Sequence, residues 1–295
     1  MAYKPQRLTV AEGGTGVATL ALNGILFGNG TSAIQATSAA ANSLLITNGS
    51  NVPALGTTLA NSFACTASSS GGTISTTTSN TSNTASSNAL SQVTVAGTSA
   101  GDAQSTYTVT GGSQWSLGTD NSDSDAFTIS GGAVLGTNNV MRISGNGEIN
   151  YPLQVAFLAN HSGTQTDVTG DGTTVTVTWG TEIFDQNGDF ASNTFTAPVT
   201  GRYFLAASIF PEGITASHTA GTFNFASSNR TYQFSGMSYG ACRSATNYIL
   251  TQASMLCDMD AADTCTITFG LANGTKVVDL NGTSTNSFFS GFLAC

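Results

Sequence analysis

The sequence predicts an all-β protein drawn out into an elongated fibre, and three observations support this prediction. Charged residues make up only 8% of the chain, against about 25% in an average soluble domain, so long solvent-facing helices would lack polar cover. Short segments alternate polar and apolar side chains between Gly and Asn turns, which is typical of strands. Long stretches of Ser, Thr, Asn and Gly hold too few apolar residues for a core of their own.

The charge balance excludes several classes of partner. The net charge is −9, with seven Lys and Arg residues among 295, whereas a nucleic-acid binder needs a dense basic surface. Anionic membrane surfaces are disfavoured for the same reason. No apolar run reaches about 18 residues, so we expect no membrane insertion, and the N-terminal residues lack the apolar segment of a secretory signal.

Residues 1–60 contain an internal repeat, and we interpret them as an anchor or the start of a shaft. The segment NGILFGNGT at residues 23–31 recurs as NSLLITNGS at residues 42–50, a spacing of 19 residues. Each unit is a short apolar strand followed by an Asn-Gly turn, which is a strong hairpin signal. A unit this small cannot bury residues 25–27 alone, so neighbouring units or other chains must cover them.

Residues 61–100 are rich in Ser, Thr and Asn. In a monomer this composition is typical of a disordered linker. The alternative is a thin ordered stalk in which three chains share a narrow core, and the fibre-like flanking segments favour it. The apolar residues available for that core are Ile74, Leu90, Val93 and Val95.

Residues 101–151 form a third segment, in which strand-like pairs such as Phe127 and Ile129 alternate with Gly, Asn and Asp turns. Trp115 opens the run WSLGTDNSDSD, which is followed by FTIS at residues 127–130. This run resembles a module of viral, bacteriophage-type tail-fibre and receptor-binding proteins that precedes a distal domain. The resemblance implies a virion protein.

Residues 152–295 carry most of the aromatic residues and are the only segment able to bury a full globular core. The stretch Thr194–Leu205 predicts a strand, a tight corner and a second, buried strand. Pro198 fixes its own φ, and Gly201 is expected to accept backbone angles that other residues avoid. The apolar run Tyr203–Leu205 then continues as the buried strand.

The same stretch resembles the signature of the complement globular-head family, whose jelly-roll trimers share a fold with tumour necrosis factor. The family corner FTAP-x-x-G-x-Y is matched by Phe195–Pro198, Gly201 and Tyr203, and its terminal F-x-G-x-L by Phe289–Leu293. The resemblance covers roughly residues 152–295. It implies a ten-stranded jelly-roll head and a homotrimer.

The sequence gives little support for catalytic activity. The chain has two histidines, and His161 and His218 both stand in polar, turn-like contexts, so we expect them to be solvated. Neither has the Gly-x-Ser-x-Gly context of a nucleophile. The Glu residues are scattered and the Asp residues cluster in turns, where they usually cap the backbone. We therefore expect no enzyme activity.

A metal site is the more serious option, with calcium as the ion, because calcium is known in the complement-head family. No other cofactor is expected. The Asp185–Asp189 turn has the D-x-N-x-D spacing of an EF-hand, but Phe190 stands where that loop requires Gly. The candidate ligands lie in two oxygen-rich turns: Asp120, Asp123 and Asp125, and Asp185, Asn187 and Asp189.

The chain has five cysteines, an odd number, with no zinc-like spacing. One interpretation is buried free thiols in sheets. The other is a disulfide, for instance between Cys257 and Cys265 on neighbouring strands. The remaining cysteines are Cys65, Cys242 and Cys295.

Taken together, these features predict a homotrimeric virion fibre protein. Its N-terminus would bind a tail or capsid protein, and its distal head would bind a host-surface receptor, either a protein or a glycan. Three heads on one stalk gain avidity from their high effective concentration. Two alternatives stay open: a capsid-surface decoration without a receptor role, and a tailspike that depolymerises polysaccharide.

Overall fold

The computed structural model describes residues 8–9, 14–17, 19, 22, 24–38, 43–47, 52–56, 73–282 and 286–295. Over these residues it contains twenty-three strands, one short helix and one turn of 3-10 helix, which confirms the predicted all-β class. None of the helices in this described part has the length and apolar character to cross a membrane. By internal contacts the chain divides into two units, Met1–Ser91 and Gln92–Cys295.

The N-terminal repeat folds as two β-hairpins, one per unit. Leu26 lies opposite Ala36 in the first hairpin, and Leu45 lies opposite Leu55 in the second. The sequence predicted one strand in each unit and missed the returning strand. The hairpins consist of β1 (Leu26–Phe27) with β2 (Gln35–Ala36), and β3 (Leu44–Thr47) with β4 (Pro53–Gly56).

The predicted Asn-Gly turn is confirmed in the first unit. The Ser32 amide donates to the Asn29 carbonyl at 3.0 Å, and Gly30 takes a φ of +61°, which glycine adopts without a steric cost. The corresponding turn of the second unit lies outside the described residues. Leu26 is 48% exposed and Leu45 56% exposed, so each hairpin leaves apolar surface uncovered.

Residues 73–100 form turns and extended chain without an assigned strand. Leu90 is 71% exposed and Val93 54% exposed. A core shared among three chains at this place therefore stays a prediction. Over residues 73–150, the part of the expected stalk and fibre module that the structure describes, the first strand begins at Ala103.

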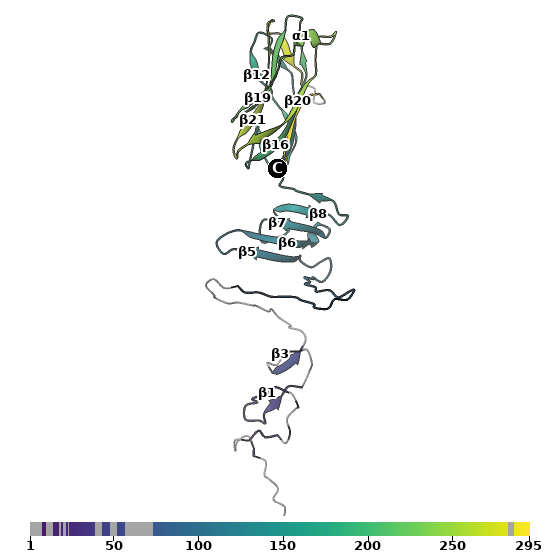
Figure 1. Cartoon of the computed structure of the whole chain (residues 1–295), viewed down its shortest axis with the longest axis vertical. Coiled ribbons are helices and arrows are strands. Elements are labelled where there is room, and N and C mark those ends of the chain that lie inside the picture. The colour runs from purple at the N-terminus through teal and green to yellow at the C-terminus, as the bar shows by residue number, and fades with distance from the viewer. Residues whose placement is uncertain are drawn as a thin grey trace, which may run out of the picture. The chain divides into compact units, whose positions relative to one another are not determined.

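The next segment is a five-stranded antiparallel meander, which we call the fibre module (Figure 1). Its strands follow one another in sequence order, each joined to the next by a turn or short loop. The loop over residues 131–138 is the longest of these. The module consists of β5 (Ala103–Thr108), β6 (Gln114–Asp120), η2 (Asn121–Asp123), β7 (Ala126–Ser130), β8 (Asn139–Ile143) and β9 (Ile149–Asn150).

The fibre module buries a polar face and exposes an apolar one. Side chains of Ser116, Thr128 and Ser130 point to the buried face. The opposite face is rich in large apolar side chains, and we call it the module face. Its most exposed members are Tyr107, Trp115, Phe127 and Ile149, which are 41–60% exposed.

The head is a sandwich of two antiparallel sheets (Figure 1). The first sheet has the order β13-β10-β23-β16-β20, and the second has the order β14-β15-β21-β18-β19 with β12 added beside β21. The first long strand of the head pairs with the last one, and the chain crosses repeatedly between sheets, which defines a jelly roll. The ten strands of these two paths confirm the predicted head.

The strands of the first sheet are β10 (Ala156–Asn160), β13 (Thr181–Asp185), β16 (Gly201–Ile209), β20 (Thr251–Met259) and β23 (Phe288–Leu293). Those of the second are β12 (Thr174–Thr176), β14 (Phe190–Ala191), β15 (Thr194–Thr196), β18 (Ala220–Ser227), β19 (Thr231–Ser235) and β21 (Thr264–Ala272). A small third sheet and the helix complete the head: β11 (Gln165–Thr169), β17 (Pro211–Glu212), β22 (Val278–Leu280) and α1 (Tyr239–Cys242).

Aromatic packing fills the space between the sheets. The Phe157 ring stacks on Phe190 at 4.9 Å and on Phe195 at 5.0 Å, and it meets Phe289 edge-on at 5.0 Å. All four side chains are at most 3% exposed. Because they come from four different strands, this cluster holds the two sheets together.

The corner after β15 is confirmed, but the reason for its glycine differs from the expectation. Gly201 has ordinary backbone angles, since it is absent from the residues with positive φ. A Cβ there would lie 2.8 Å from Leu293 Cδ1 and 2.9 Å from the Cys295 carbonyl oxygen. The glycine is therefore required by close packing against the C-terminus. Tyr203, fully buried, donates to the Val199 carbonyl at 2.6 Å and so closes the corner.

Candidate functional site

The outer side of the first head sheet carries an exposed apolar row. Along β16 the side chains alternate, so that Tyr203 and Leu205 face the core and Phe204 faces outward. Phe204 lies opposite Phe292 on β23 and Leu256 on β20, and the two phenyl rings are 5.4 Å apart. These three side chains, which we call the apolar row, are 36–55% exposed.

The sequence treated the run Tyr203–Leu205 as wholly buried, and this was wrong for Phe204. Three consecutive apolar residues in a strand must place one on the opposite face, because successive side chains alternate. The signal was therefore present in the period-2 pattern. The pattern alone could not predict the strand register, which brings Phe292 and Leu256 beside Phe204.

Uncharged residues border the apolar row on one side, and Arg202 and Asp258 border it on the other. Leu158, Ser290, Ala206 and Ser254 lie side by side across four strands. A shallow groove of about 340 Å³ runs from Phe204 past Ala206 and Ser254 towards Gln252 and Phe288, on β16, β20 and β23. An apolar sheet face of this kind, with no charged side chain among its lining residues, is typical of a protein interface.

A polar cluster marks the edge where β19 and β20 approach each other. Asp258 accepts hydrogen bonds from the Tyr232 hydroxyl and, at 2.8 Å, from Arg230. Burial raises the pKa of Tyr232 to about 12, while the hydrogen bond from Tyr232 lowers the pKa of Asp258. The cluster therefore fixes this edge of the sandwich and limits the apolar face.

A second surface, which we call the hydroxyl groove, lies mostly on the second head sheet and reaches β20 of the first sheet at Thr251 and Gln252. Two hollows of about 380 and 350 Å³ share Ser235 and Met237. Glycines and Thr side chains line the first, whereas Phe234 and Gln233 line the second. Exposed hydroxyls, amides and one aromatic ring without a formal charge suit an uncharged polar ligand.

The expectation of solvated histidines was wrong: His161 is 1% exposed and His218 is fully buried. The Gln165 carbonyl oxygen accepts from the Thr178 amide at 2.9 Å and lies 3.0 Å from His161 Nε2. His161 therefore carries its proton on Nε2, since an amide oxygen only accepts. The ring also meets Trp179 edge-on. Polar neighbours in the sequence did not reveal this packing.

His218 ties two loops together. Its Nδ1 accepts from the Thr215 amide at 2.8 Å, and its Nε2 lies 3.0 Å from the Thr275 carbonyl oxygen. A Cβ on Gly274 would come within 2.3 Å of the ring, and one on Gly170 within 2.8 Å. Both ring nitrogens are thus used structurally. Over the described residues, no group of three or more His, Cys, Asp or Glu side chains is placed to hold a metal.

The turn that begins at Asp185 uses its carboxylate for the backbone. Asp185 accepts from the amides of Gly188, Asp189 and Phe190 at 2.9–3.1 Å, while Asn187 donates to Asp189 at 3.0 Å. Burial raises the pKa of Asp189. This geometry is a side-chain-capped turn, and a calcium role for Asp185, Asn187 and Asp189 stays a prediction.

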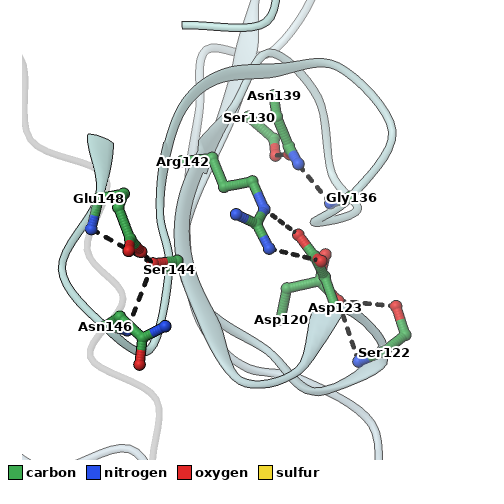
Figure 2. A network of polar contacts seen from close by, with 10 residues as sticks. All are labelled: Asp120, Ser122, Asp123, Ser130, Gly136, Asn139, Arg142, Ser144, Asn146 and Glu148. Carbon is green, nitrogen blue, oxygen red and sulfur yellow. Dashed lines mark hydrogen bonds and ion pairs between the residues drawn. The ribbon is translucent and has the colours of Figure 1, made fainter. Parts of the chain in front are cut away.

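The other predicted metal residues lie in the fibre module (Figure 2). Asp123 forms a double hydrogen bond with Arg142, through Nε and, at 2.8 Å, through Nη2. Asp120 is 1% exposed and caps η2, where one of its oxygens accepts from the Ser122 amide and hydroxyl. Asp125 is exposed. The structure therefore separates the three carboxylates into different roles.

We expect Asp123→Asn to destabilise the fibre module at neutral pH and to have little effect in acid. The hydrogen bonds from Arg142 hold the pKa of the Asp123 carboxyl below its usual 3.8. The pair therefore stabilises the fold above that pH and loses its effect as the pH falls through the lowered pKa. Unfolding temperatures of both proteins between about pH 2 and 7 would measure this. A difference that is constant with pH would contradict it.

Cys257 and Cys265 follow the first of the two interpretations, whereas Cys242 and Cys295 are exposed and lie outside the strands. Cys242, Cys257, Cys265 and Cys295 are free thiols, and Cys65 lies outside the described residues. The Cys257–Cys265 disulfide is not formed. Both side chains are buried, and burial raises the pKa of Cys257 to about 12 and that of Cys265 above its usual range. They act as small core residues.

Comparisons with known proteins give a likeness only to solved structures. No protein-family model matches the chain, and no curated protein is similar to it in sequence. The globular domain of zebrafish complement 1qA protein is 17% identical over 48% of this chain and 98% of that chain, with a TM-score of 0.35. Two crystal structures of murine APRIL are each 12% identical with the same coverage. The TM-score is 0.35 for the structure at pH 5.0 and 0.34 for the structure at pH 8.5. The jelly-roll assignment follows from strand order and register.

Proposed function

We propose that this chain is the subunit of a homotrimeric attachment fibre, in which the head binds a receptor on a host-cell surface. The observation that carries the proposal is that two successive β domains each expose a large apolar sheet face. In the head this is the apolar row, and in the fibre module it is the module face. A soluble protein rarely leaves such faces open unless they bind another protein.

A second copy of the chain is the partner that we propose for each of the two faces. The three side chains of the apolar row are uncharged, and Arg202 and Asp258 lie opposite each other at the next position of the same face. The Trp115 and Phe127 side chains of the module face are 44% and 41% exposed in a domain whose other face is already closed. Further copies of the chain would cover each of these faces. That the number of copies is three rests on the resemblance of residues 152–295 to the complement globular-head family.

The receptor would bind in the hydroxyl groove, most of whose lining residues belong to the second head sheet, while the apolar row of the first sheet would serve assembly. The hydroxyl groove offers side-chain hydroxyls and amides, with Phe234 as an apolar contact. Such a surface suits a neutral glycan or an uncharged peptide loop. Three grooves on one fibre would bind the same cell surface, and this avidity raises the overall affinity even when each single contact is weak.

The setting we propose is a virion. It is supported by the repeat at residues 23–31 and 42–50 and by the DNSDSD run at residues 120–125, which resembles viral fibre modules. The N-terminal hairpins would join a tail or capsid protein, and the head would be distal. Synthesis in the host cytoplasm is part of the same proposal.

The proposal is tested first by the mass of the full chain in dilute buffer. We expect three times the chain mass of 29.9 kDa by native mass spectrometry, and a lower mass after denaturation. A single-copy particle would contradict the trimer. Clearing of capsular polysaccharide by the purified protein would instead support a tailspike enzyme. Normal adsorption of virions that lack the head would support a decoration role.

We expect Ser235→Trp to abolish adsorption of the fluorescently labelled full chain to the susceptible strains of a bacterial panel. Ser235 lines both hollows of the hydroxyl groove, so an indole there fills the space that a ligand would occupy. Asn146→Trp, at an exposed turn of the fibre module, is the bulk-matched control and should adsorb like the unchanged protein. Unchanged adsorption of Ser235→Trp would place the receptor contact elsewhere.

A further inference from the structure

The buried face of the fibre module is polar, which calls for an account of its hydrogen bonds. The Ser116 hydroxyl donates to the Gly132 carbonyl at 2.8 Å, and the Ser130 hydroxyl to the Asn139 side-chain oxygen at 2.6 Å. Asp120 uses one carboxylate oxygen to cap η2. These groups are satisfied, and Figure 2 shows the Ser130–Asn139 and Asp120–Ser122 contacts.

Three buried oxygens on the same face have no hydrogen-bond partner. They are the second carboxylate oxygen of Asp120, the hydroxyl of Thr128 and the side-chain carbonyl of Gln104. Asp120 is 1% exposed and Thr128 is fully buried. Leaving such groups unpaired costs about 1–3 kcal/mol each, and more where the group is charged, so their coincidence in one place indicates a bound species.

The strand register brings these oxygens to neighbouring positions. Gln104 on β5 and Thr128 on β7 lie on either side of Gly118 on β6, which has no side chain to separate them. Asp120 follows Gly118 by two residues and so points to the same face. The three oxygens therefore surround a position at which the sheet carries no side chain.

The loop over residues 131–138 covers this position. The side-chain nitrogen of Gln104 donates to the Ala133 carbonyl at 3.3 Å. The side-chain oxygen of Gln104 therefore points away from this hydrogen bond. Gly136, with a φ of +82°, approaches Asp120 so closely that a Cβ would lie 2.7 Å from the unpartnered oxygen. The loop thus closes the buried face without supplying a donor to Asp120.

The charges around the site leave negative charge uncompensated. Asp123 and Arg142 pair with each other, and Figure 2 shows this pair beside Asp120. Arg142 is close enough for its charge to interact with Asp120 as well, which weakens the attraction for a cation. Counted together, these two carboxylates and one guanidinium give a net charge of −1. The carboxylates of Glu148, which interacts with Arg142, and of Asp102, which accepts from the Asn121 amide, add further negative charge nearby.

We infer that Asp120, Thr128 and Gln104 form a binding site for a hard, oxygen-seeking cation such as Ca²⁺. Carboxylate, hydroxyl and amide oxygens are the ligands that such cations prefer, and nitrogen and sulfur donors are absent from the set. Ca²⁺ takes about six to eight oxygens, so water and loop carbonyls would complete the shell. Only Asp120 is retained from the three carboxylates that the sequence singled out.

The test is Ca²⁺ binding by the full chain after treatment with EDTA. We expect calorimetry to detect binding, and CaCl2 to raise the unfolding temperature of the module relative to NaCl at equal ionic strength, by mass action. Trp115 fluorescence in a Trp179→Phe background reports on this module, because the chain has two tryptophans. Absence of both effects would overturn the inference and leave water as the partner of these oxygens.

The variant Asp120→Asn is expected to shift the unfolding temperature in opposite directions without and with Ca²⁺. A purely structural role of Asp120 would not produce this reversal. Without Ca²⁺ the variant should unfold at a higher temperature than the unchanged protein, because it removes a buried unpaired charge. With Ca²⁺ the order should invert, since only the unchanged protein binds the ion. Asp125→Asn, at an exposed position of the same turn, is the matched control and should keep the full Ca²⁺ response.

A second variant keeps the inference testable if Asp120→Asn does not fold. Thr128→Val conserves the shape of the side chain and removes the hydroxyl, and we expect it to weaken Ca²⁺ binding by at least about tenfold. A Ca²⁺ response that persists unchanged in Asp120→Asn or in Thr128→Val would place the ion elsewhere and overturn the inference. The site is independent of the proposed attachment role, so failure of either leaves the other intact.

Discussion

Replacing Phe204 and Phe292 together by aspartate is expected to convert the assembled protein into monomers and to abolish attachment to cells. In the single chain these side chains are 36% and 47% exposed, so the charges remain solvated and the fold survives. In an assembly through the apolar row they would be buried without partners, which costs several kcal/mol per charge. Sedimentation velocity on the purified full chain measures the change directly.

The control for this experiment is Val277→Asp, at a side chain 42% exposed on a loop outside the apolar row. It adds one charge at similar exposure and should leave the mass unchanged. Circular dichroism would show that all variants keep their β structure. If the Phe204 and Phe292 double variant retained the mass of the unchanged protein, the apolar row would not be the interface.

The second large effect is expected at the centre of the head. Phe157→Ala should destabilise the head by about 3–5 kcal/mol, the usual cost of truncating a buried aromatic side chain. Phe157 is 2% exposed and contacts the rings of Phe190, Phe195 and Phe289. The alanine would leave a cavity between the two sheets, where four strands limit relaxation. Some of the protein would unfold at ordinary temperatures.

Urea unfolding, followed by Trp179 fluorescence in a Trp115→Phe background, measures this loss. Trp179 packs 5.9 Å from Phe289, so it reports on the same core. All variants must be compared at one chain concentration, because assembly adds to apparent stability. Phe234→Ala, whose side chain is 40% exposed, is the control and should cost about 0.5–1.5 kcal/mol, the value of one edge-to-face contact. Equal losses in the two variants would contradict the central role of Phe157.

The corner at Thr194–Leu205 shows which structural features a short sequence pattern can predict. Pro198, the alternating strand and the aromatic that follows predicted both strands and the turn between them, because these depend on neighbouring residues. The reason for Gly201 could not be predicted. It is set by Leu293 and Cys295 at the other end of the head, and such long-range packing has no signature in a short stretch of sequence.

The polar residues show the same limit more strongly. The sequence grouped Asp120, Asp123 and Asp125 by spacing, whereas the fold gives Asp123 to Arg142 and leaves Asp125 exposed. It also expected solvated histidines, yet both are buried and hydrogen-bonded. A polar side chain has similar neighbours in the sequence whether it caps a turn, pairs with a distant charge or closes a core.

By itself the sequence determined the all-β class and one apolar strand in each N-terminal repeat unit, because alternation, turn residues and low charge act over a few residues at a time. The jelly-roll head was expected from the resemblance of residues 152–295 to the complement globular-head family. Only the tertiary structure decided which faces stay open and which oxygens meet. The apolar row exists because the register of three strands aligns Phe204, Phe292 and Leu256. The oxygen site of the fibre module likewise arises only when β5, β6 and β7 pair, since its members are far apart along the chain.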